Sequence, residues 1–366
     1  MIELTAGKDD SGRRLDRILR KALPDLSLSL IHRLLRQKKI LVDNKPASPD
    51  YRIEQGMIIK VYTFATHISN QVNKTIVNHK NIKVNNNFGF VSQPIPKPSA
   101  HERRKGSPFN PSLHCSFLIA HSSLSPVPIL WQGSGIIVFN KPQGLSTHGP
   151  QSLDTIVTTW LDGEGTLPRS LSFRPGPLHR LDKPTSGAIA FSQTLEGARL
   201  FSSLLKERKL EKSYIAIVEG RIDGENIWRD TLEHDKNARK SLISPRPLTP
   251  NSRLPIQKEA LTTVKTLATN NKYSLIEAKI KTGRHHQIRA QACSHGHPLA
   301  GDIKYGAKAM LDQSHGGSYF LHAWKIKFIE CPEGFPREIT APIPEAFQSQ
   351  ITALFGKCKY LSENIT

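Results

Sequence analysis

The chain has 366 residues, and its 51 Lys and Arg outnumber its 31 Asp and Glu, which gives a net charge of +20 at pH 7. So basic a balance is typical of proteins that bind a polyanion, either nucleic acid or an anionic membrane surface. No apolar run reaches 18 residues, and the first ten residues do not resemble a secretory signal. The four cysteines have no paired spacing, which indicates a reducing compartment. We therefore expect a cytoplasmic protein that binds nucleic acid and does not enter a membrane.

Residues 1–62 are predicted to form a small domain of two helices followed by strands. Apolar residues recur at helical spacing at Leu15, Ile18, Leu19 and Ala22, and again over 30–35 after a break at Pro24. Ser27 or Ser29 is a candidate cap for the second helix. Strands are predicted at 40–42 and 57–62, with a turn at Asp43-Asn44.

This first domain is also strongly basic. Between residues 11 and 45 the sequence has ten Lys and Arg but three Asp. A solvated helix face is one explanation, but we favour a phosphate-binding surface. The stretch resembles the S4 RNA-binding domain, in which two helices precede a short strand and turn. The resemblance implies RNA contacts by Arg14, Arg17, Arg33, Arg36, Lys38 and Lys39.

Residues 63–130 differ in composition from the rest of the chain. Asn, Ser, Pro, His and Lys dominate, and the hydrophobic periodicity is weak. Little apolar surface is available to offset the entropy cost of ordering such a segment. We predict a low-complexity linker or insert, and we assign it no function.

Residues 131–350 regain a globular pattern and are predicted to form the catalytic domain, followed by a C-terminal tail over 351–366. Strands are predicted at 135–139, 188–191, 212–220, 273–281 and 320–328, a helix at 195–205, a helix start at 283–290, and an exposed loop at 235–258. The strand at 212–220 is apolar on both faces, which places it centrally. Strands and helices do not alternate regularly, so the fold class is α+β with a mixed, mostly antiparallel central sheet.

One acidic residue of this domain lies between basic neighbours. Asp182 follows Arg180 and precedes Lys183, and a Thr-Ser-Gly turn leads from it into an apolar strand. A surface salt bridge would explain such a tetrapeptide. A polar turn between rigid elements is also how proteins hold a reactive side chain.

Several segments, taken in order, resemble the RluA family of pseudouridine synthases. They are Phe139-Asn140-Lys141-Pro142, His179-Arg180-Leu181-Asp182-Lys183-Pro184-Thr185-Ser186-Gly187, Lys212-Ser213-Tyr214, Gly283-Arg284-His285-His286-Gln287-Ile288-Arg289, Gly301-Asp302 and Leu321-His322-Ala323. His285 stands where the family more often has Thr or Ser, and the 63–130 insert is longer than the usual link. The resemblance implies a pseudouridine synthase fold. With an S4 domain in front, it also implies activity on large-subunit (23S) ribosomal RNA.

The implied reaction needs little from the protein besides one carboxylate. Uridine isomerisation breaks the N1–C1′ bond, turns the base and rejoins it through C5, so no cofactor is expected. An aspartate kept ionised by a cation can act at C1′, at C6 or on a ribose proton, and the sequence leaves these routes open. The resemblance makes Asp182 catalytic, pairs Arg289 with it and lays Tyr214 over the base. Without the resemblance, Tyr214 would be a core tyrosine and Arg289 a surface residue.

The target base must be turned out of its RNA stack, and a planar cation is suited to fill the gap. The resemblance gives this role to Arg180 and packs Leu321 against the uracil. We interpret His179 as structural or as an RNA hydrogen-bond donor. The histidines near Cys293 have no spacing that suits a four-ligand zinc site, so no metal is expected.

Two alternatives to ribosomal RNA modification remain at this point. The same chemistry on tRNA or another RNA is one, because the catalytic motifs do not encode the target. A non-catalytic RNA-binding or ribosome-assembly protein is the other. A pure binder has no physical need for a buried, paired carboxylate, so the intact set of Asp182, Tyr214 and Arg289 argues against it. We expect the protein to act as a monomer.

Overall fold

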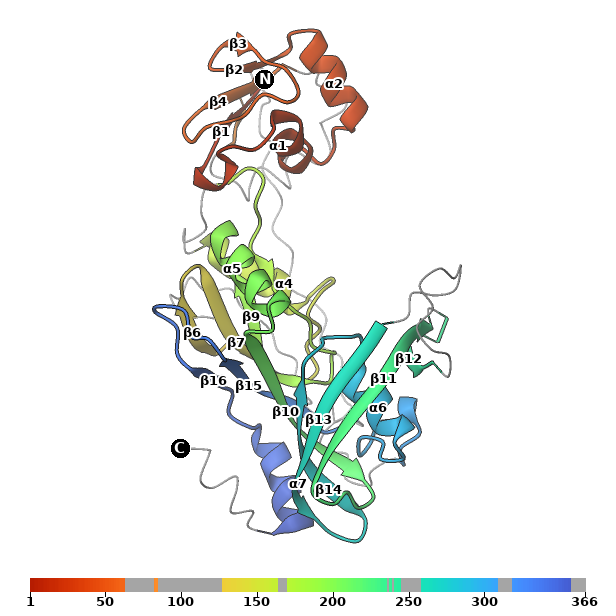
Figure 1. The fold of residues 1–366 in the computed structure, drawn as a ribbon. Helices are drawn as coiled ribbons and strands as arrows, with labels where there is room; N and C mark the ends of the chain where they lie inside the picture. Colours follow the sequence, from red (N-terminus) through yellow and green to blue (C-terminus); the bar gives the residue numbers. More distant parts are fainter. Residues whose placement is uncertain are drawn as a thin grey trace, which may run out of the picture. The chain divides into compact units, whose positions relative to one another are not determined.

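A computed structural model describes residues 1–62, 82–84, 127–163, 170–235, 237–238, 240–244, 258–308 and 318–356. The chain divides into two compact units, 1–124 and 125–366 (Figure 1). The insert predicted over 63–130 lies outside the described residues, apart from 82–84 and 127–130. No helix of the described part is long and apolar enough to cross a bilayer.

The first unit has the two predicted helices and the strands predicted after them, but a strand and a short 3₁₀ helix also precede the helices. Its elements are β1 (Ile2–Thr5), η1 (Lys8–Asp10), α1 (Leu15–Ala22), α2 (Leu28–Arg36), β2 (Ile40–Val42), β3 (Lys45–Pro46), β4 (Ile58–Val61) and β5 (Ile82–Val84). The strands form a sheet in the order β3-β2-β4-β1-β5. Ser27 caps α2 by accepting a hydrogen bond from the Leu30 amide at 3.3 Å. The strands β1, β3 and β5 were not predicted.

The turn predicted at Asp43-Asn44 joins β2 to β3. Both residues have positive φ, 46° and 64°. Two such residues form the tight turn that matches the twist of an antiparallel hairpin, and Asp and Asn tolerate this conformation better than most residues. The Asp43 carboxylate also accepts a hydrogen bond from the Ile58 amide at 2.9 Å, which ties the turn to β4.

The second unit is built on one large sheet. Its strands are β6 (Ile129–Gly133), β7 (Ile136–Lys141), β8 (Gly176–Pro177), β9 (Ser186–Ser192), β10 (Leu210–Glu219), β11 (Glu225–Asp235), β12 (Lys240–Ile243), β13 (Lys258–Thr269), β14 (Tyr273–Ile280), β15 (Leu321–Phe328) and β16 (Glu338–Thr340). The main path runs β12-β11-β13-β14-β10-β15-β9-β7-β6. The described strands pair antiparallel, except for the parallel pair β9–β15. The predicted mixed, mostly antiparallel sheet is confirmed, and β10 lies centrally between β14 and β15.

Helices cover both faces of this sheet. They are α4 (Leu153–Gly163), α5 (Leu195–Lys206), α6 (Gln287–Ser294), η3 (Ile303–Tyr305) and α7 (Glu345–Phe355). Successive residues of β7 alternate between two cores: Phe139 packs with α4, whereas Val138 packs with α5. A strand buried on both faces has to be apolar throughout, which is why the sequence showed it clearly. Figure 1 shows α6 beside β11 and β12.

Some predicted boundaries fall differently in the structure. The exposed loop predicted over 235–258 contains strand β12, and its residues 245–257 lie outside the described part. Helix α7 runs past residue 350, where the tail was expected to begin, and 357–366 are not described. The long strands β11 and β13 were missed, because their exposed faces place charged and Thr residues throughout the pattern.

Gly187 fixes how the polar turn after Asp182 meets the sheet. It has a φ of 108°, and a Cβ at this position would overlap the carbonyl oxygen of Ala323 in β15. Only glycine combines this backbone conformation with so close an approach. The parallel pairing of β9 with β15 therefore brings the start of β9 directly against residues 322–323.

Candidate active site

Asp182 lies in the loop between β8 and β9, and hydrogen bonds fix this loop on both sides of the residue. The Thr147 hydroxyl donates to the Leu181 carbonyl at 2.8 Å and accepts from the Leu181 amide at 3.2 Å. On the other side, the Thr185 amide donates to the Asp182 carbonyl at 3.0 Å. The backbone that carries the carboxylate is therefore held in one conformation, as a preorganised site requires.

Lys141 stabilises the same loop through hydrogen bonds to backbone carbonyls. Its side chain is fully buried, and its ammonium donates to the carbonyls of Pro142, Leu145 and Lys183 at 3.0, 2.7 and 3.2 Å. Burial lowers the pKa of Lys141 to about 7, although the negative charge of Asp182 opposes that shift. The lysine of the Asn-Lys-Pro segment thus supports the loop and makes no contact with the pocket.

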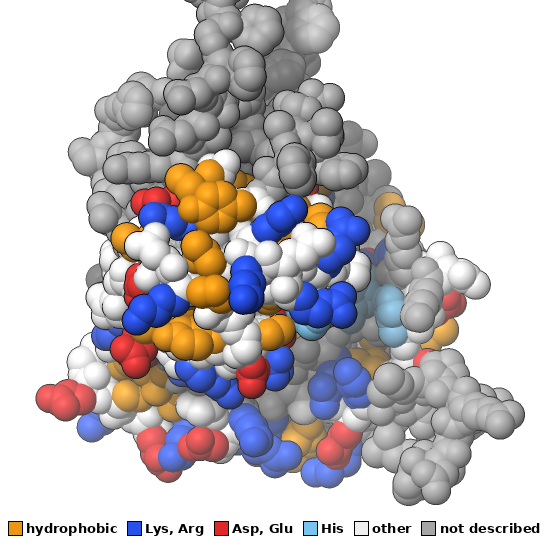
Figure 2. Space-filling view, turned by 90° about the horizontal axis from the view of Figure 1, so that it is seen from above, with side chains coloured by type: hydrophobic (Ala, Val, Ile, Leu, Met, Phe, Trp, Pro, Cys, Tyr) orange, Lys and Arg blue, Asp and Glu red, His pale blue; other side chains and the backbone are white. Residues whose placement is uncertain are grey.

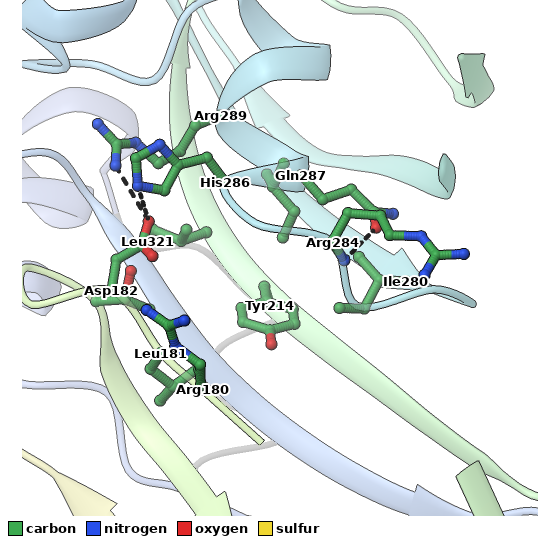
Figure 3. Close-up of a pocket in the computed structure, with 12 residues that line it drawn as sticks. Arg180, Leu181, Asp182, Tyr214, Ile280, Arg284, His286, Gln287, Arg289 and Leu321 are labelled. Carbon is green, nitrogen blue, oxygen red and sulfur yellow. Dashed lines mark hydrogen bonds and ion pairs between the residues drawn. The ribbon is translucent and has the colours of Figure 1, made fainter. Parts of the chain in front are cut away.

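The Asp182 carboxylate is 24% exposed, and its contacts concentrate on one oxygen. Oδ2 accepts hydrogen bonds from Arg289 Nη1 at 3.1 Å and from the Tyr319 hydroxyl at 3.2 Å, and His286 Nε2 lies 3.4 Å away. In Figure 3, His286 and Arg289 converge on Asp182. Within the described residues Oδ1 has no hydrogen-bond donor, so it is the oxygen left for a substrate.

Arg289 is positioned by a second carboxylate. Asp302 accepts from its Nε at 2.6 Å and from its Nη2 at 2.8 Å, which leaves Nη1 for Asp182. The guanidinium also packs over the rings of Tyr319 and Tyr305, with its central carbon 4.3 and 4.8 Å from the ring centres. Burial disfavours the charge, but the hydrogen bonds and negative charges around it keep the pKa of Arg289 above its usual value. It is a fixed cation at pH 7.

An open pocket lies beside Asp182. Tyr214, Ile280 and Leu321 supply apolar walls, and Arg180 and Arg284 supply positive charge (Figure 3). Tyr214 lies on β10, and burial, together with the charge of Asp182, raises the pKa of its hydroxyl. Its ring is therefore neutral at pH 7.

The two remaining candidates of the motif have different surroundings. Arg180 is exposed and lines the pocket together with Asp182, so the two side chains share one side of the loop. His179 faces away from the pocket: its Nε2 accepts from the Ala190 amide at 3.1 Å, and its ring stacks on Phe201. Burial lowers the pKa of His179 to about 3. These contacts favour the structural interpretation of His179 over an RNA contact.

The six basic residues predicted to bind RNA in the first unit differ in their exposure and in their ion pairs. Arg17, Arg33, Arg36 and Lys38 are exposed, and Lys39 is half-buried. Arg14 binds both oxygens of Asp16 at 3.1 and 2.8 Å, so its charge is largely compensated. Lys and Arg side chains recur across the face seen in Figure 2, among hydrophobic, neutral and acidic ones.

Four residues that the sequence analysis gave no role contact the site. Asp302 holds Arg289, Tyr319 donates to Asp182, Tyr305 packs on Arg289, and His286 lies against Asp182. Asp302 and His286 belong to segments that carried the family resemblance, so their place in those segments could have identified them as site residues. Tyr319 and Tyr305 had none, because they lie outside any periodic element. The described residues contain no group of three or more His, Cys, Asp or Glu able to hold a metal ion.

Comparison with known families agrees with both units. Residues 135–294 match the family described as RNA pseudouridylate synthase, and residues 13–59 match the S4 domain. The first match spans the segments around Asp182, Tyr214 and Arg289, and the second spans α1, α2 and the strands after them.

Individual proteins are similar over nearly the whole chain. Ribosomal large subunit pseudouridine synthase C of Escherichia coli is 25% identical over 356 residues, which cover 95% of this chain and 94% of that protein. Ribosomal large subunit pseudouridine synthase D of Neisseria meningitidis is 26% identical over 370 residues, with 96% and 82% covered. Among solved structures, Human RNA Pseudouridylate Synthase Domain Containing 4 has the same fold, with a TM-score of 0.50 at 22% identity over 62% of this chain and 92% of that one.

Proposed function

This chain belongs to the RNA pseudouridylate synthase family and carries an N-terminal S4 domain, and from that premise we propose that it converts uridines of large-subunit ribosomal RNA to pseudouridine. The observation that supports the chemistry is the half-free carboxylate of Asp182, set in a pocket beside the fixed cation of Arg289. The relatives named for the ribosomal large subunit match over both units, which supports the choice of RNA. Action on ribosomal RNA places the protein in the cytoplasm. We propose that the protein acts as a monomer.

In this mechanism the protein provides the carboxylate of Asp182 and the pocket that receives the base. The N1–C1′ bond breaks, the base turns, a C5–C1′ bond forms, and C5 loses a proton as N1 gains one, so no electrons are exchanged. Asp182 Oδ1 acts on the nucleotide, while Arg289 and Tyr319 hold Oδ2 in place. A uracil turned out of its stack lies against the ring of Tyr214, with Leu321 and Ile280 on its other sides. The exposed Arg180 occupies the space that the base leaves in the RNA.

The exchange Asp182→Asn tests the chemistry. We expect this variant to form no pseudouridine in protein-free large-subunit ribosomal RNA, while its RNA affinity stays within about threefold of the unmodified chain, since a neutral amide of similar shape replaces the carboxylate. Asp223→Asn, which changes a fully solvated carboxylate of an exposed ion pair, is the matched control and should keep full activity. Pseudouridine formation by Asp182→Asn would contradict the proposed role, and modification of tRNA alone would contradict the proposed substrate.

The S4 domain is proposed to bind phosphates, and salt dependence tests this separately. Each cation that neutralises a phosphate contributes about 0.7–0.9 to the slope of log affinity against log salt. Arg33→Gln together with Arg36→Gln should therefore flatten the slope by about 1.5, with the rate at saturating RNA unchanged. Arg14→Gln is the control, since Asp16 already compensates this charge, and it should change the slope less. An unchanged slope in the Arg33/Arg36 variant removes that surface from the RNA interface.

A further inference from the structure

Three histidine rings form a continuous array from the pocket to the surface. His286 lines the pocket and lies 3.4 Å from Asp182. The ring of His285 stacks on it, with 3.7 Å between ring centres and 21° between planes. The ring of His234, on β11, meets His285 edge-on at 4.7 Å and 72°. Both His285 and His234 are exposed, so the array ends at the solvent.

The edge strand β12 holds this array in place. The Ser241 hydroxyl donates to the His285 carbonyl at 2.6 Å and lies 3.2 Å from His285 Nδ1. The Tyr305 hydroxyl links the backbone of Ser241, at 2.9 Å from its amide, to His286 Nδ1 at 3.0 Å. His286 itself has a left-handed backbone, with a φ of 51°, at the start of α6. Residues held in this sparsely populated conformation cluster at functional sites.

His285 and His286 lie near the charges of the site but carry little charge of their own. Burial, opposed by Asp182, lowers the pKa of His286 to about 3, and burial is also the main cause of the lowered pKa of His285. The ring of His285 stacks on His286, which lines the pocket, so His285 lies beside the pocket. A neutral, flat and exposed ring is poorly suited to bind a phosphate. It is well suited to stack on a nucleobase.

We infer that His285, fixed by Ser241 and backed by His286, is a ledge on which the base next to the target uridine stacks. The inference rests on the proposed function and adds a determinant of which uridine is modified. Turning one base into the pocket exposes the face of its neighbour, and the ledge would cover that face beside the cavity. The identity of this residue would thus affect substrate choice without contributing to the chemistry.

The test uses the full chain and a synthetic RNA of about 20 nucleotides centred on a uridine that it modifies in ribosomal RNA. Stacking of one base is worth about 1–3 kcal/mol. His285→Thr should therefore raise the RNA concentration needed for half-maximal rate about tenfold, with the rate at saturation within about threefold. His285→Phe keeps a ring and should stay within about threefold on both measures. A purely structural role would instead lower the saturating rate, through His286 and Asp182, in both variants.

An abasic nucleotide on the 5′ or the 3′ side of the target uridine completes the test. On one of these two RNAs the unmodified chain and His285→Thr should become equal, because the base that stacks is gone. A tenfold difference that persists on both abasic RNAs overturns the inference, as does a His285→Thr variant with normal affinity. Asp182→Asn, run on the same RNA, keeps the two proposals apart. If the unmodified chain makes no pseudouridine or Asp182→Asn still does, the proposed function fails, whatever His285 does.

Discussion

Replacing Asp302 by asparagine should destabilise the second unit, because it leaves the Arg289 guanidinium buried with one charged partner fewer. Both side chains lie in the interior, with 6% of Arg289 and 2% of Asp302 exposed. Two hydrogen bonds, at 2.6 and 2.8 Å, join them. Asparagine offers one acceptor for two donors and no negative charge.

The size of the effect follows from this burial. Removing one partner of a buried ion pair costs about 3–5 kcal/mol, since the other charge stays desolvated. Asp182 remains 3.1 Å from Nη1 and asparagine keeps one acceptor, so the lower end applies, about 3 kcal/mol. For a unit of this size, that loss lowers the melting temperature by roughly 6–12 °C.

Tryptophan fluorescence during urea unfolding measures the free energy of unfolding of the second unit, because all four tryptophans lie between residues 131 and 324. Asp223→Asn, in an exposed ion pair with Arg221, should cost less than about 1 kcal/mol. In the Arg289→Met background the cost of Asp302→Asn should fall below about 1 kcal/mol, because no buried cation remains to be compensated. A loss that is equally large in that background would refute the reasoning, and so would a single-variant cost near that of the control.

Three further outcomes follow from contacts in the same unit. His322 is fully buried, and burial lowers its pKa from 6.5 to about 4. As pH falls, the unfolded chain therefore binds the extra proton first, which favours unfolding. Between pH 7 and 5 the free energy of unfolding, measured in urea, should fall by about 2 kcal/mol more for the unmodified chain than for His322→Gln. Gly187→Ala should cost more than about 3 kcal/mol by the same assay, whereas Gly144→Ala, with positive φ but open space around it, should cost about 1. Tyr319→Phe removes a donor to Asp182 and should lower the saturating rate of pseudouridine formation about tenfold, and a normal rate would show that this bond does not orient the carboxylate.

The sequence predicted those parts of the fold where one physical signal dominates. Strand β7 is buried on both faces and is apolar over its first four residues, and helix α1 keeps its buried residues at helical spacing. Strands β11 and β13 give no such signal, because an exposed face near the edge of a sheet accepts charged and hydroxyl side chains. Their registers are set by pairing with each other and with β14, which is a tertiary property.

The site divides in the same way. Asp182 and Arg289 were expected together from the family resemblance, and the structure places them 3.1 Å apart. Tyr319 donates to Asp182, which lies 137 residues earlier in the chain. Asp302 binds Arg289, 13 residues earlier, from a loop without periodicity. No local sequence pattern indicates which carboxylate binds a given arginine, so these contacts could be identified only from the three-dimensional structure.

The parallel pairing of β9 with β15 has a consequence for protein synthesis. Asp182 is synthesised before Leu321, which completes its pocket from 139 residues later in the chain. At about 5–20 residues per second, this takes roughly 7–28 s. During that interval the nascent chain has the Asp182 carboxylate, but it lacks Leu321, which lines the pocket, and strand β15, against which Gly187 packs. A chain that has not yet been extended to Leu321 therefore lacks the complete pocket.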